Sequence, residues 1–274
     1  MVLVVIDGLS VDQWVVLRDE LSEKQQALQF QEDAVFCWIP TTTSVSRQAL
    51  FAGKAPLYFP GSIHTTEKES ALWIQFWIDQ GLAQHQIAYK RGLGNESLDE
   101  LRESLSQPQL RIVGLVVDKV DKIMHGMELG TAGMHNQVRQ WALGGYINKL
   151  IDILQSHGFR VWITSDHGNI EAEGCGRPEE GAIADIRGER VRVYSNPLLR
   201  SKVQMRFPDA IDWPLIGLPE DYLPLLAKGR TAFIPEGKKT VAHGGITIEE
   251  AIVPLIQVAD RDQRQSENRQ RSEP

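Results

Sequence analysis

The chain has 274 residues, 42% of them hydrophobic and 24% charged, which is ordinary for one large or two small soluble α/β domains. A formal net charge of −7 argues against a broad basic surface for nucleic acid, but it still allows a local basic groove. Cys37 and Cys175 lie far apart in the sequence, which excludes a disulfide scaffold and favours a reduced, cytoplasmic chain.

The opening apolar run, residues 2–6, is too short for a signal peptide, and no apolar segment is long enough to span a bilayer. We therefore expect no membrane association. Because the first predicted strand begins almost at Met1, the sequence also leaves open that this chain is a fragment of a longer protein.

Strand-like and helix-like segments alternate along the chain, which is typical of a doubly wound, mainly parallel sheet with helices on both faces. Helical spacing of apolar residues predicts helices at residues 11–28, 44–53, 67–81, 97–106 and 134–157. Short apolar runs predict strands at residues 2–6, 34–39, 85–89, 112–117, 159–164, 231–234 and 252–258. Thr247 and Glu250 form a capping signal for a further short helix.

The C-terminal third has weaker periodicity. We expect one domain over residues 1–259, with an irregular cap or loop region at about 171–229. Its first part, 171–194, is interpreted as a loop or lid over the strand edge, with a hairpin at 187–190. The polar tail, 260–274, is expected to be disordered.

Three aspartates, Asp7, Asp121 and Asp166, each follow a short β-branched apolar run. Such runs are typical of strands buried on both faces of a parallel sheet. Open α/β sheets place ligands at the carboxyl ends of their strands, so these side chains are expected to converge at one edge. Because three converging carboxylates would repel one another, the pattern predicts cations between them.

Two of these aspartates have a histidine at metal-ligand spacing. His125 follows Asp121 by four residues, which places both side chains on one face of a turn. A single motif of this kind is often accidental, and Asp118 is an alternative to Asp121 as the ligand.

Asp166 and His167 are adjacent, and Gly168 permits the sharp turn that two neighbouring ligands need. A turn that merely ends a strand is the simpler explanation of this motif. His243 precedes Gly244-Gly245 and is a weaker candidate when taken alone. The remaining histidines lie outside any motif and are interpreted as ordinary: His64, His85, His135 and His157.

Residues 40–47 form a threonine-rich turn before a predicted helix. The segment could simply cap the helix, or its hydroxyls could face an anion at the helix N-terminus. Arg47, one turn further on, could then fork onto the oxygens of that anion. A threonine hydroxyl becomes a nucleophile when a metal ion lowers its pKa.

Taken in order, these segments resemble the ligand set of the alkaline phosphatase superfamily. The matching segments are Asp7-Gly8, Thr43-x-x-Ser46-Arg47, Asp121-x-x-x-His125, Asp166-His167-Gly168 and His243-Gly244-Gly245. Within the superfamily, residues 40–53 and 243–254 resemble the nucleophile and closing segments of PglZ domains, which occur in BREX-type phage-defence systems.

The resemblance implies two divalent metal ions, zinc in the first place and manganese as the alternative. One ion would be held by Asp121, His125 and His243, and the other by Asp7, Asp166, His167 and the Thr43 oxygen. Thr43 is the expected nucleophile because sulfatases carry theirs three residues before a Ser-Arg pair, with Thr42 as the alternative.

The resemblance further implies a metal-dependent hydrolase of phosphate esters, a phosphodiesterase or nuclease acting in phage defence beside other BREX proteins. A non-catalytic metal-binding scaffold is the main alternative. A phosphomutase is a weaker one, because such mutases carry an extra domain that residues 44–120 do not provide. Several basic residues could form a phosphate-backbone track for nucleic acid, although such residues more often belong to a solvated face: Lys119, Lys122, Arg177, Arg187, Arg190 and Arg192.

Overall fold

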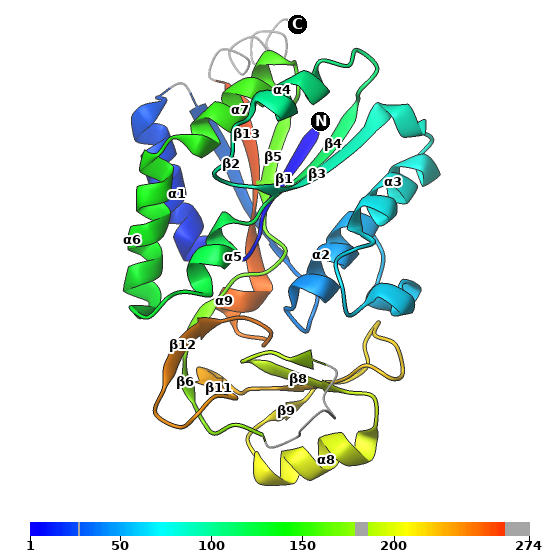
Figure 1. The fold of residues 1–274 in the computed structure, drawn as a ribbon, viewed down its shortest axis with the longest axis vertical. Coiled ribbons are helices and arrows are strands. Elements are labelled where there is room, and N and C mark those ends of the chain that lie inside the picture. Colours follow the sequence, from blue (N-terminus) through cyan, green and yellow to red (C-terminus); the bar gives the residue numbers. More distant parts are fainter. Residues whose placement is uncertain (27, 179–185, 261–274) are drawn as a thin grey trace, which may run out of the picture.

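The computed structural model describes residues 1–26, 28–178 and 186–260, and its centre is a six-stranded sheet (Figure 1). In spatial order the strands are β2 (Leu28–Phe36), β13 (Ile252–Asp260), β5 (Val161–Thr164), β1 (Val2–Ile6), β4 (Ile112–Val117) and β3 (Ile87–Leu93). Strand β1 pairs in parallel with β4 and β5, and β3 pairs in parallel with β4. Strand β13 alone runs in the opposite direction to the other strands, because it pairs antiparallel with both β2 and β5. The predicted mainly parallel sheet is therefore confirmed.

Helices cover both faces of the sheet. Successive side chains of its central strands point in opposite directions, so each strand packs against helices on both faces. On β1, Val4 packs into the core formed with α1, α4, α6 and α7, whereas Val5 packs with Phe51 and Trp73 of α2 and α3. Figure 1 shows these two groups of helices on opposite sides of the sheet. Their bounds are α1 Val11–Lys24, α2 Thr43–Ala52, α3 Glu69–Asp79, α4 Asp99–Leu105, α6 Gly130–Leu143 and α7 Tyr146–Ser156.

Several of the predicted boundaries were wrong; the strand expected at 34–39, for example, spans Leu28–Phe36. The helix expected over 134–157 is two helices, α6 and α7, because the chain turns at Gly144-Gly145 and Gly145 adopts a positive φ of 74°. Leu28, placed at the end of the first predicted helix, instead begins β2. A short helix that the sequence analysis left as a turn, α5 (Lys119–Met124), follows β4.

The region expected to be irregular contains regular elements, so that description was wrong. One antiparallel sheet is formed by β7 (Ile186–Arg187), β8 (Val191–Tyr194), β10 (Leu223–Leu226) and β9 (Ile211–Asp212). A second sheet, of mixed direction, is formed by β11 (Thr231–Ala232), β6 (Ile170–Gly174) and β12 (Lys239–Ala242). Helix α8 (Pro197–Arg206) packs on the first of these sheets. The predicted hairpin is confirmed, since β7 and β8 pair on either side of residues 188–190.

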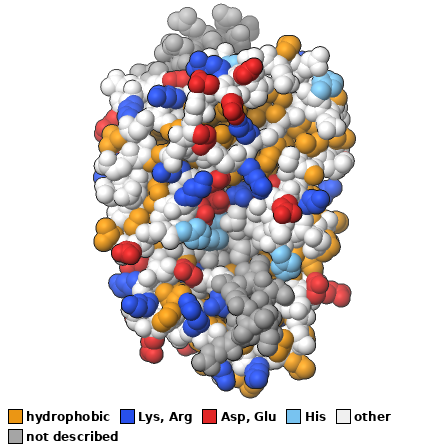
Figure 2. All heavy atoms as spheres, in the orientation of Figure 1, with side chains coloured by type: hydrophobic (Ala, Val, Ile, Leu, Met, Phe, Trp, Pro, Cys, Tyr) orange, Lys and Arg blue, Asp and Glu red, His pale blue; other side chains and the backbone are white. Residues whose placement is uncertain are grey.

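The capping signal at Thr247 is confirmed at the start of α9 (Ile248–Ala251), where Glu250 accepts a hydrogen bond from the Thr247 backbone N–H. The expectation of disorder beyond Asp260 concerns residues outside those described. Within the described ranges, every helix is too short or too polar to cross a bilayer. On the face shown in Figure 2, basic and acidic side chains are interspersed, in keeping with the acidic net charge.

Gly114, in the centre of β4, offers a test of this packing. A Cβ atom there would lie 3.0 Å from the ring of Trp73 and 3.2 Å from that of Phe51, so α2 and α3 approach the sheet closely at this point. We expect Gly114→Val to lower the free energy of unfolding by about 1–3 kcal/mol through overpacking. Urea denaturation followed by tryptophan fluorescence measures the change.

Gly61 provides the control, because a Cβ atom there would have no neighbour within 4 Å. Gly61→Ala should change the free energy of unfolding by less than about 0.5 kcal/mol. A Gly114→Val protein as stable as the parent would contradict this account of the helix–sheet contact.

Candidate metal centre

The carboxylates picked out by the sequence meet at one edge of the large sheet. Asp7 directly follows β1, Asp166 lies two residues after β5, and Asp121 lies in α5, just after β4. These three strands are neighbours in the sheet and run parallel, so their carboxyl ends coincide. The Asp121 backbone N–H donates to the Asp7 carbonyl oxygen at 3.1 Å, which joins the two loops directly.

Two groups of candidate ligands gather at this edge. One consists of Asp121, His125 and His243, and the other of Asp7, Asp166 and His167. Within each group, one ligand atom from every residue lies within 4.8 Å of the others. The rings of His167 and His243 are stacked, with centroids 3.8 Å apart, so the two groups lie side by side. This is the partition that the family resemblance implied.

Thr43, the first residue of α2, lies beside the second group. Its Oγ1 is 3.0 Å from Nε2 of His167. The alternative, Thr42, is the N-cap residue, and its buried hydroxyl has no hydrogen-bond partner within the described part of the chain. The geometry therefore favours Thr43 over Thr42 as the hydroxyl that acts with the candidate ligands.

The geometry also favours Asp121 over Asp118 as the ligand. Asp118 is the N-cap residue of α5, and its Oδ2 lies 3.5 Å from Nζ of Lys122. Asp121 instead has its Oδ1 3.4 Å from Nε2 of His125 and belongs to the first group.

The carboxylates of both groups have oxygens that are suited to bind cations. Among the described residues, Asp7 Oδ1, Asp121 Oδ1 and Asp166 Oδ2 are buried and lack a hydrogen-bond partner. Buried polar atoms are rarely left in this state, because desolvation without a partner costs free energy. Three such oxygens beside three imidazoles fit divalent cations in both their position and their chemistry.

In the metal-free chain, burial shifts the pKa values of these groups away from their ordinary values. Burial, together with the nearby Asp166 carboxylate, raises the pKa of Asp7 from 3.8 to about 8. Burial likewise raises the pKa of Asp166 to about 6. Burial lowers the pKa of His243 to about 4, and it also lowers the pKa of His167, so both rings are neutral at pH 7, as metal ligands must be.

Backbone carbonyl groups fix the orientation of both buried imidazoles. Nδ1 of His243 lies 2.7 Å from the Thr41 carbonyl oxygen, and Nδ1 of His167 lies 3.0 Å from the Gly168 carbonyl oxygen. Since a carbonyl oxygen only accepts hydrogen bonds, Nδ1 carries the proton in each ring and Nε2 keeps a free lone pair. The nitrogen that can bind a metal therefore faces the site in both residues.

Thr41 was not singled out by the sequence analysis, yet it joins the nucleophile segment to the His243 loop. Its hydroxyl accepts a hydrogen bond from the Gly244 N–H at 2.9 Å and donates one to the Gly245 carbonyl oxygen at 2.9 Å. Thr41 is fully buried, so these bonds are shielded from water. The only signal in the sequence was the run of three threonines.

Arg47 has a different position from the one expected. Its guanidinium group is buried and donates to Asp7 Oδ2 at 2.5 Å and to Glu69 Oε1 at 2.8 Å. Asp166 Oδ2 lies 3.8 Å from the same group. This geometry favours a positioning role behind the carboxylates in place of the predicted fork onto a substrate anion. Glu69 also accepts a hydrogen bond from the Tyr89 hydroxyl at 2.6 Å, and neither residue was predicted to take part.

Gly168 is required for a reason other than the predicted one. Its φ is not positive, but a Cβ atom there would lie 1.9 Å from the Glu249 carbonyl oxygen. The residue must therefore lack a side chain because α9 passes directly over the Asp166-His167 turn.

A buried ion pair stabilises the loop that carries His243. Nη2 of Arg190 lies 2.7 Å from Glu250 Oε2, and Glu250 Oε1 also accepts the Gly245 N–H at 2.8 Å. Arg190 and Arg192 are both buried, so neither belongs to the surface phosphate track considered for them. Lys122 of that track is exposed and lies beside Asp118, and the Arg187 side chain is outside those described.

A cavity of about 730 Å³ opens onto this centre. Its walls include Thr43, His125 and His243 on the side of the candidate metal centre, and Arg91 and His64 elsewhere. A ligand in the cavity could thus contact the nucleophile candidate and the first group of metal ligands together.

Solved structures of other proteins share this fold. Murine ectonucleotide pyrophosphatase/phosphodiesterase 5 is 12% identical with a TM-score of 0.69, and 93% of this chain and 87% of that chain are covered. The murine protein has also been solved as an inactive threonine-to-alanine variant in complex with AMP. Phosphonoacetate hydrolase from Sinorhizobium meliloti 1021 is 14% identical with a TM-score of 0.53, over 93% and 89% of the two chains.

At these identities the similarity concerns the fold. No curated protein matches the chain in sequence. The family described as the BREX system PglZ alkaline phosphatase-like domain matches residues 1–258, which is nearly all of the described structure. The chain therefore belongs to the PglZ family of alkaline phosphatase-like domains.

Proposed function

We propose that this protein is a metal-dependent phosphodiesterase that uses Thr43 as its nucleophile. The observation that carries the proposal is the position of the Thr43 hydroxyl, 3.0 Å from His167 and beside two groups of candidate metal ligands. The inactive threonine-to-alanine variant of the murine phosphodiesterase supports a threonine as the residue that such a fold requires.

The two groups would hold two divalent ions, one with Asp121, His125 and His243 and the other with Asp7, Asp166, His167 and the Thr43 oxygen. When bound, such ions supply Lewis-acid chemistry that lowers the pKa of a hydroxyl and neutralises phosphate charge. Three imidazoles beside carboxylates favour zinc, with manganese as the alternative.

The chain itself supplies the nucleophile and its alignment. Thr43 Oγ1 loses its proton to solvent and attacks phosphorus as the bond to the leaving alkoxide breaks. The phosphoryl group, with its remaining ester substituent, is transferred to the threonine, and the alkoxide takes up a proton from solvent. The first turn of α2 directs free backbone N–H groups toward the phosphate oxygens, which suits developing negative charge. Water then cleaves the bond between phosphorus and Thr43 Oγ1, which releases a phosphomonoester and restores the hydroxyl.

We further propose that the activity serves the BREX defence system in the cytoplasm, with DNA, RNA or a smaller diester as substrate. Family membership supports the defence role, and the cavity of about 730 Å³ gives room for a nucleotide beside the centre. A non-catalytic scaffold remains the competing function, and turnover separates the two.

Thr43→Ala tests the nucleophile. Hydrolysis of bis-p-nitrophenyl phosphate with zinc or manganese should fall by at least about 10³-fold, because the substitution removes the attacking hydroxyl. Metal content, measured by plasma mass spectrometry, should remain at half or more of the parent value.

Thr42→Ala is the matched control, and it should retain activity within about threefold, because the Thr42 hydroxyl makes no hydrogen bond in the structure. Full activity in Thr43→Ala would refute the nucleophile assignment. A parent protein that binds metal but hydrolyses neither phosphodiesters nor phosphomonoesters would favour the scaffold.

Metal uptake should release protons. Because the pKa of Asp7 is raised from 3.8 to about 8, the metal-free chain holds a proton there at pH 7, and a cation must displace it. The same shift destabilises the metal-free chain progressively as the pH rises from 3.8 toward 8, since the unfolded chain then loses the Asp7 proton while the folded chain keeps it.

Calorimetric titration with manganese in two buffers of different ionisation enthalpy measures this release. We expect greater release at about pH 6.5, where Asp7 is protonated, than at about pH 8.5, where most of its protons are already lost. Identical heats in both buffers at the lower pH would show that the carboxylates are already ionised.

Thr41→Val tests the link between the nucleophile segment and the His243 loop. Loss of the hydrogen bonds to Gly244 and Gly245 should loosen His243 and weaken binding of one metal ion about 10–100-fold. Competition with a chromogenic chelator measures the affinity. Thr41→Ser keeps the hydroxyl and should restore most of it, whereas equal losses in both variants would point to packing of the methyl group.

A further inference from the structure

A second cavity, of about 700 Å³, shares no lining residue with the one at the metal centre. Helix α5 connects the two. Its first residue, Lys119, borders the second cavity, whereas Met124, its last residue, and His125 border the first. The second cavity also lies beyond the carboxyl ends of β3 and β4, where open α/β sheets commonly bind ligands.

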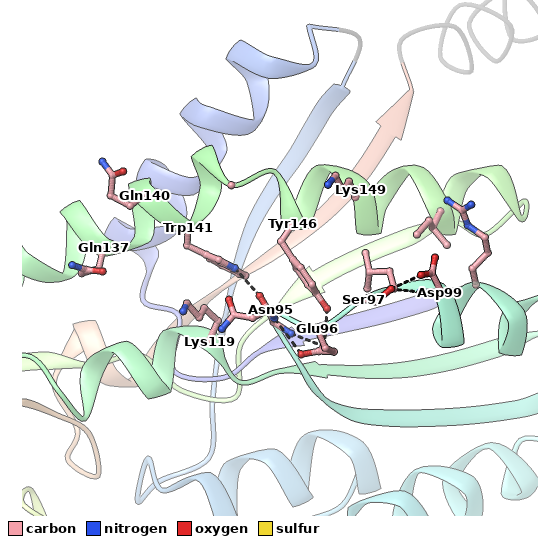
Figure 3. Close-up of a pocket in the computed structure, with 15 residues that line it drawn as sticks. Asn95, Glu96, Ser97, Asp99, Lys119, Gln137, Gln140, Trp141, Tyr146 and Lys149 are labelled. Atoms are coloured by element: carbon pink, nitrogen blue, oxygen red, sulfur yellow. Dashed lines mark hydrogen bonds between the residues drawn. The ribbon is translucent and has the colours of Figure 1, made fainter.

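The walls of this cavity come from the loop after β3 and from helices α4, α5, α6 and α7 (Figure 3). The loop after β3, residues 94–98, forms one side with Arg102 of α4. Trp141 of α6 and Tyr146 of α7 face this loop. The space therefore lies between segments that are distant in sequence, and each segment contributes polar side chains to it.

The cationic side chains of the lining lack acidic partners. Lys119, Arg102 and Lys149 form no salt bridge within the described part of the chain, and Arg102 and Lys149 are exposed. Lys119 Nζ lies 3.2 Å from the neutral amide oxygen of Asn95 when that amide is oriented to satisfy its neighbours. Three positive charges thus border one cavity in a chain whose net charge is −7.

The two carboxylates of the lining are already engaged by donors. Glu96 accepts hydrogen bonds from the Gly94 N–H at 2.9 Å and from the Tyr146 hydroxyl at 2.9 Å. Asp99 accepts one from the Ser97 hydroxyl at 2.6 Å. The cavity therefore has more positive than negative charge, and its free hydrogen-bonding capacity consists largely of donors.

The base of the cavity is ordered by its own contacts. Trp141 is buried, donates to the Gly94 carbonyl oxygen at 3.0 Å, and stacks on Tyr146 with ring centroids 6.4 Å apart. A Cβ atom at Gly94 would lie 3.1 Å from the Lys119 Cβ, so the loop packs tightly against the start of α5. A ligand would enter a largely preformed site, which reduces the entropic cost of binding.

We propose that this cavity binds an oligoanion with successive phosphate groups, such as a polyphosphate or a short phosphodiester strand. Figure 3 shows Lys119 and Lys149 on opposite sides of Tyr146, an arrangement that suits a chain of phosphates passing from one lysine to the other. Exposed amides of Gln137 and Gln140 add uncharged contacts along the same wall. The site is distinct from the metal centre and does not depend on the proposed catalytic activity.

The test compares calorimetric binding of two probes, inorganic tripolyphosphate and a 5′-phosphorylated tetrathymidylate, at about 50 mM salt. The cavity variant is Arg102→Glu/Lys149→Glu. The charge-matched control is Lys202→Glu/Lys238→Glu. It makes the same charge change at two exposed lysines that line neither cavity and form no ion pair with another described residue. A third variant, His243→Ala, reports binding at the metal centre.

We expect the cavity variant to lose at least about tenfold in affinity for a probe that the parent protein binds, while the control and His243→Ala lose less than about threefold. Binding of both probes would indicate recognition of phosphate chains in general, and binding of the oligonucleotide alone would indicate a strand.

Three results would overturn the proposal. They are no binding of either probe by the parent, equal losses in the cavity variant and the charge-matched control, and a loss confined to His243→Ala. Unchanged circular dichroism and an unchanged midpoint of thermal unfolding establish that the cavity variant is folded.

Discussion

Burial of like charge at one sheet edge is the constraint on which the rest of the structure depends. Asp7, Asp166 and Glu69 are all buried around a single cation, Arg47, at distances of 2.5 to 3.8 Å. If all three carboxylates ionise, the cluster carries a formal charge of −2 that the chain does not neutralise. One divalent ion would balance it, and in the metal-free chain burial and the nearby Asp166 carboxylate raise the pKa of Asp7.

Such a cluster persists only if the loops that carry it cannot move apart. Backbone groups provide this restraint: the Gly8 N–H donates to Asp166 Oδ1 at 3.2 Å, and the Leu9 N–H donates to the Ser165 hydroxyl at 2.9 Å. The Asn169 side chain adds a bond to the Gly8 carbonyl oxygen at 2.7 Å. The tips of β1 and β5 are thereby held together before any cation binds, which is the preorganisation that a metal site needs.

The smaller sheets contribute to the same centre from the other side. Arg190, at the start of β8, pairs with Glu250, which in turn holds the backbone of the loop that carries His243. The His243 ring is also tied to the Thr41 carbonyl oxygen, so the last ligand in the sequence is fixed to the segment of the nucleophile. Removal of either tie would leave a buried charge or a buried backbone group without its partner.

The sequence by itself determined the alternation of strands and helices and the placement of Asp7 and Asp166 at strand ends, because burial on two faces imposes continuous apolar runs. Its ordered motifs, read through family resemblance, also paired each carboxylate with its histidines. Only the tertiary structure decided that Arg47 faces carboxylates, that Thr41 holds His243, and that α9 passes over the Asp166 turn. These contacts join residues separated by 22 to 204 positions, and local patterns carry no record of such distant neighbours.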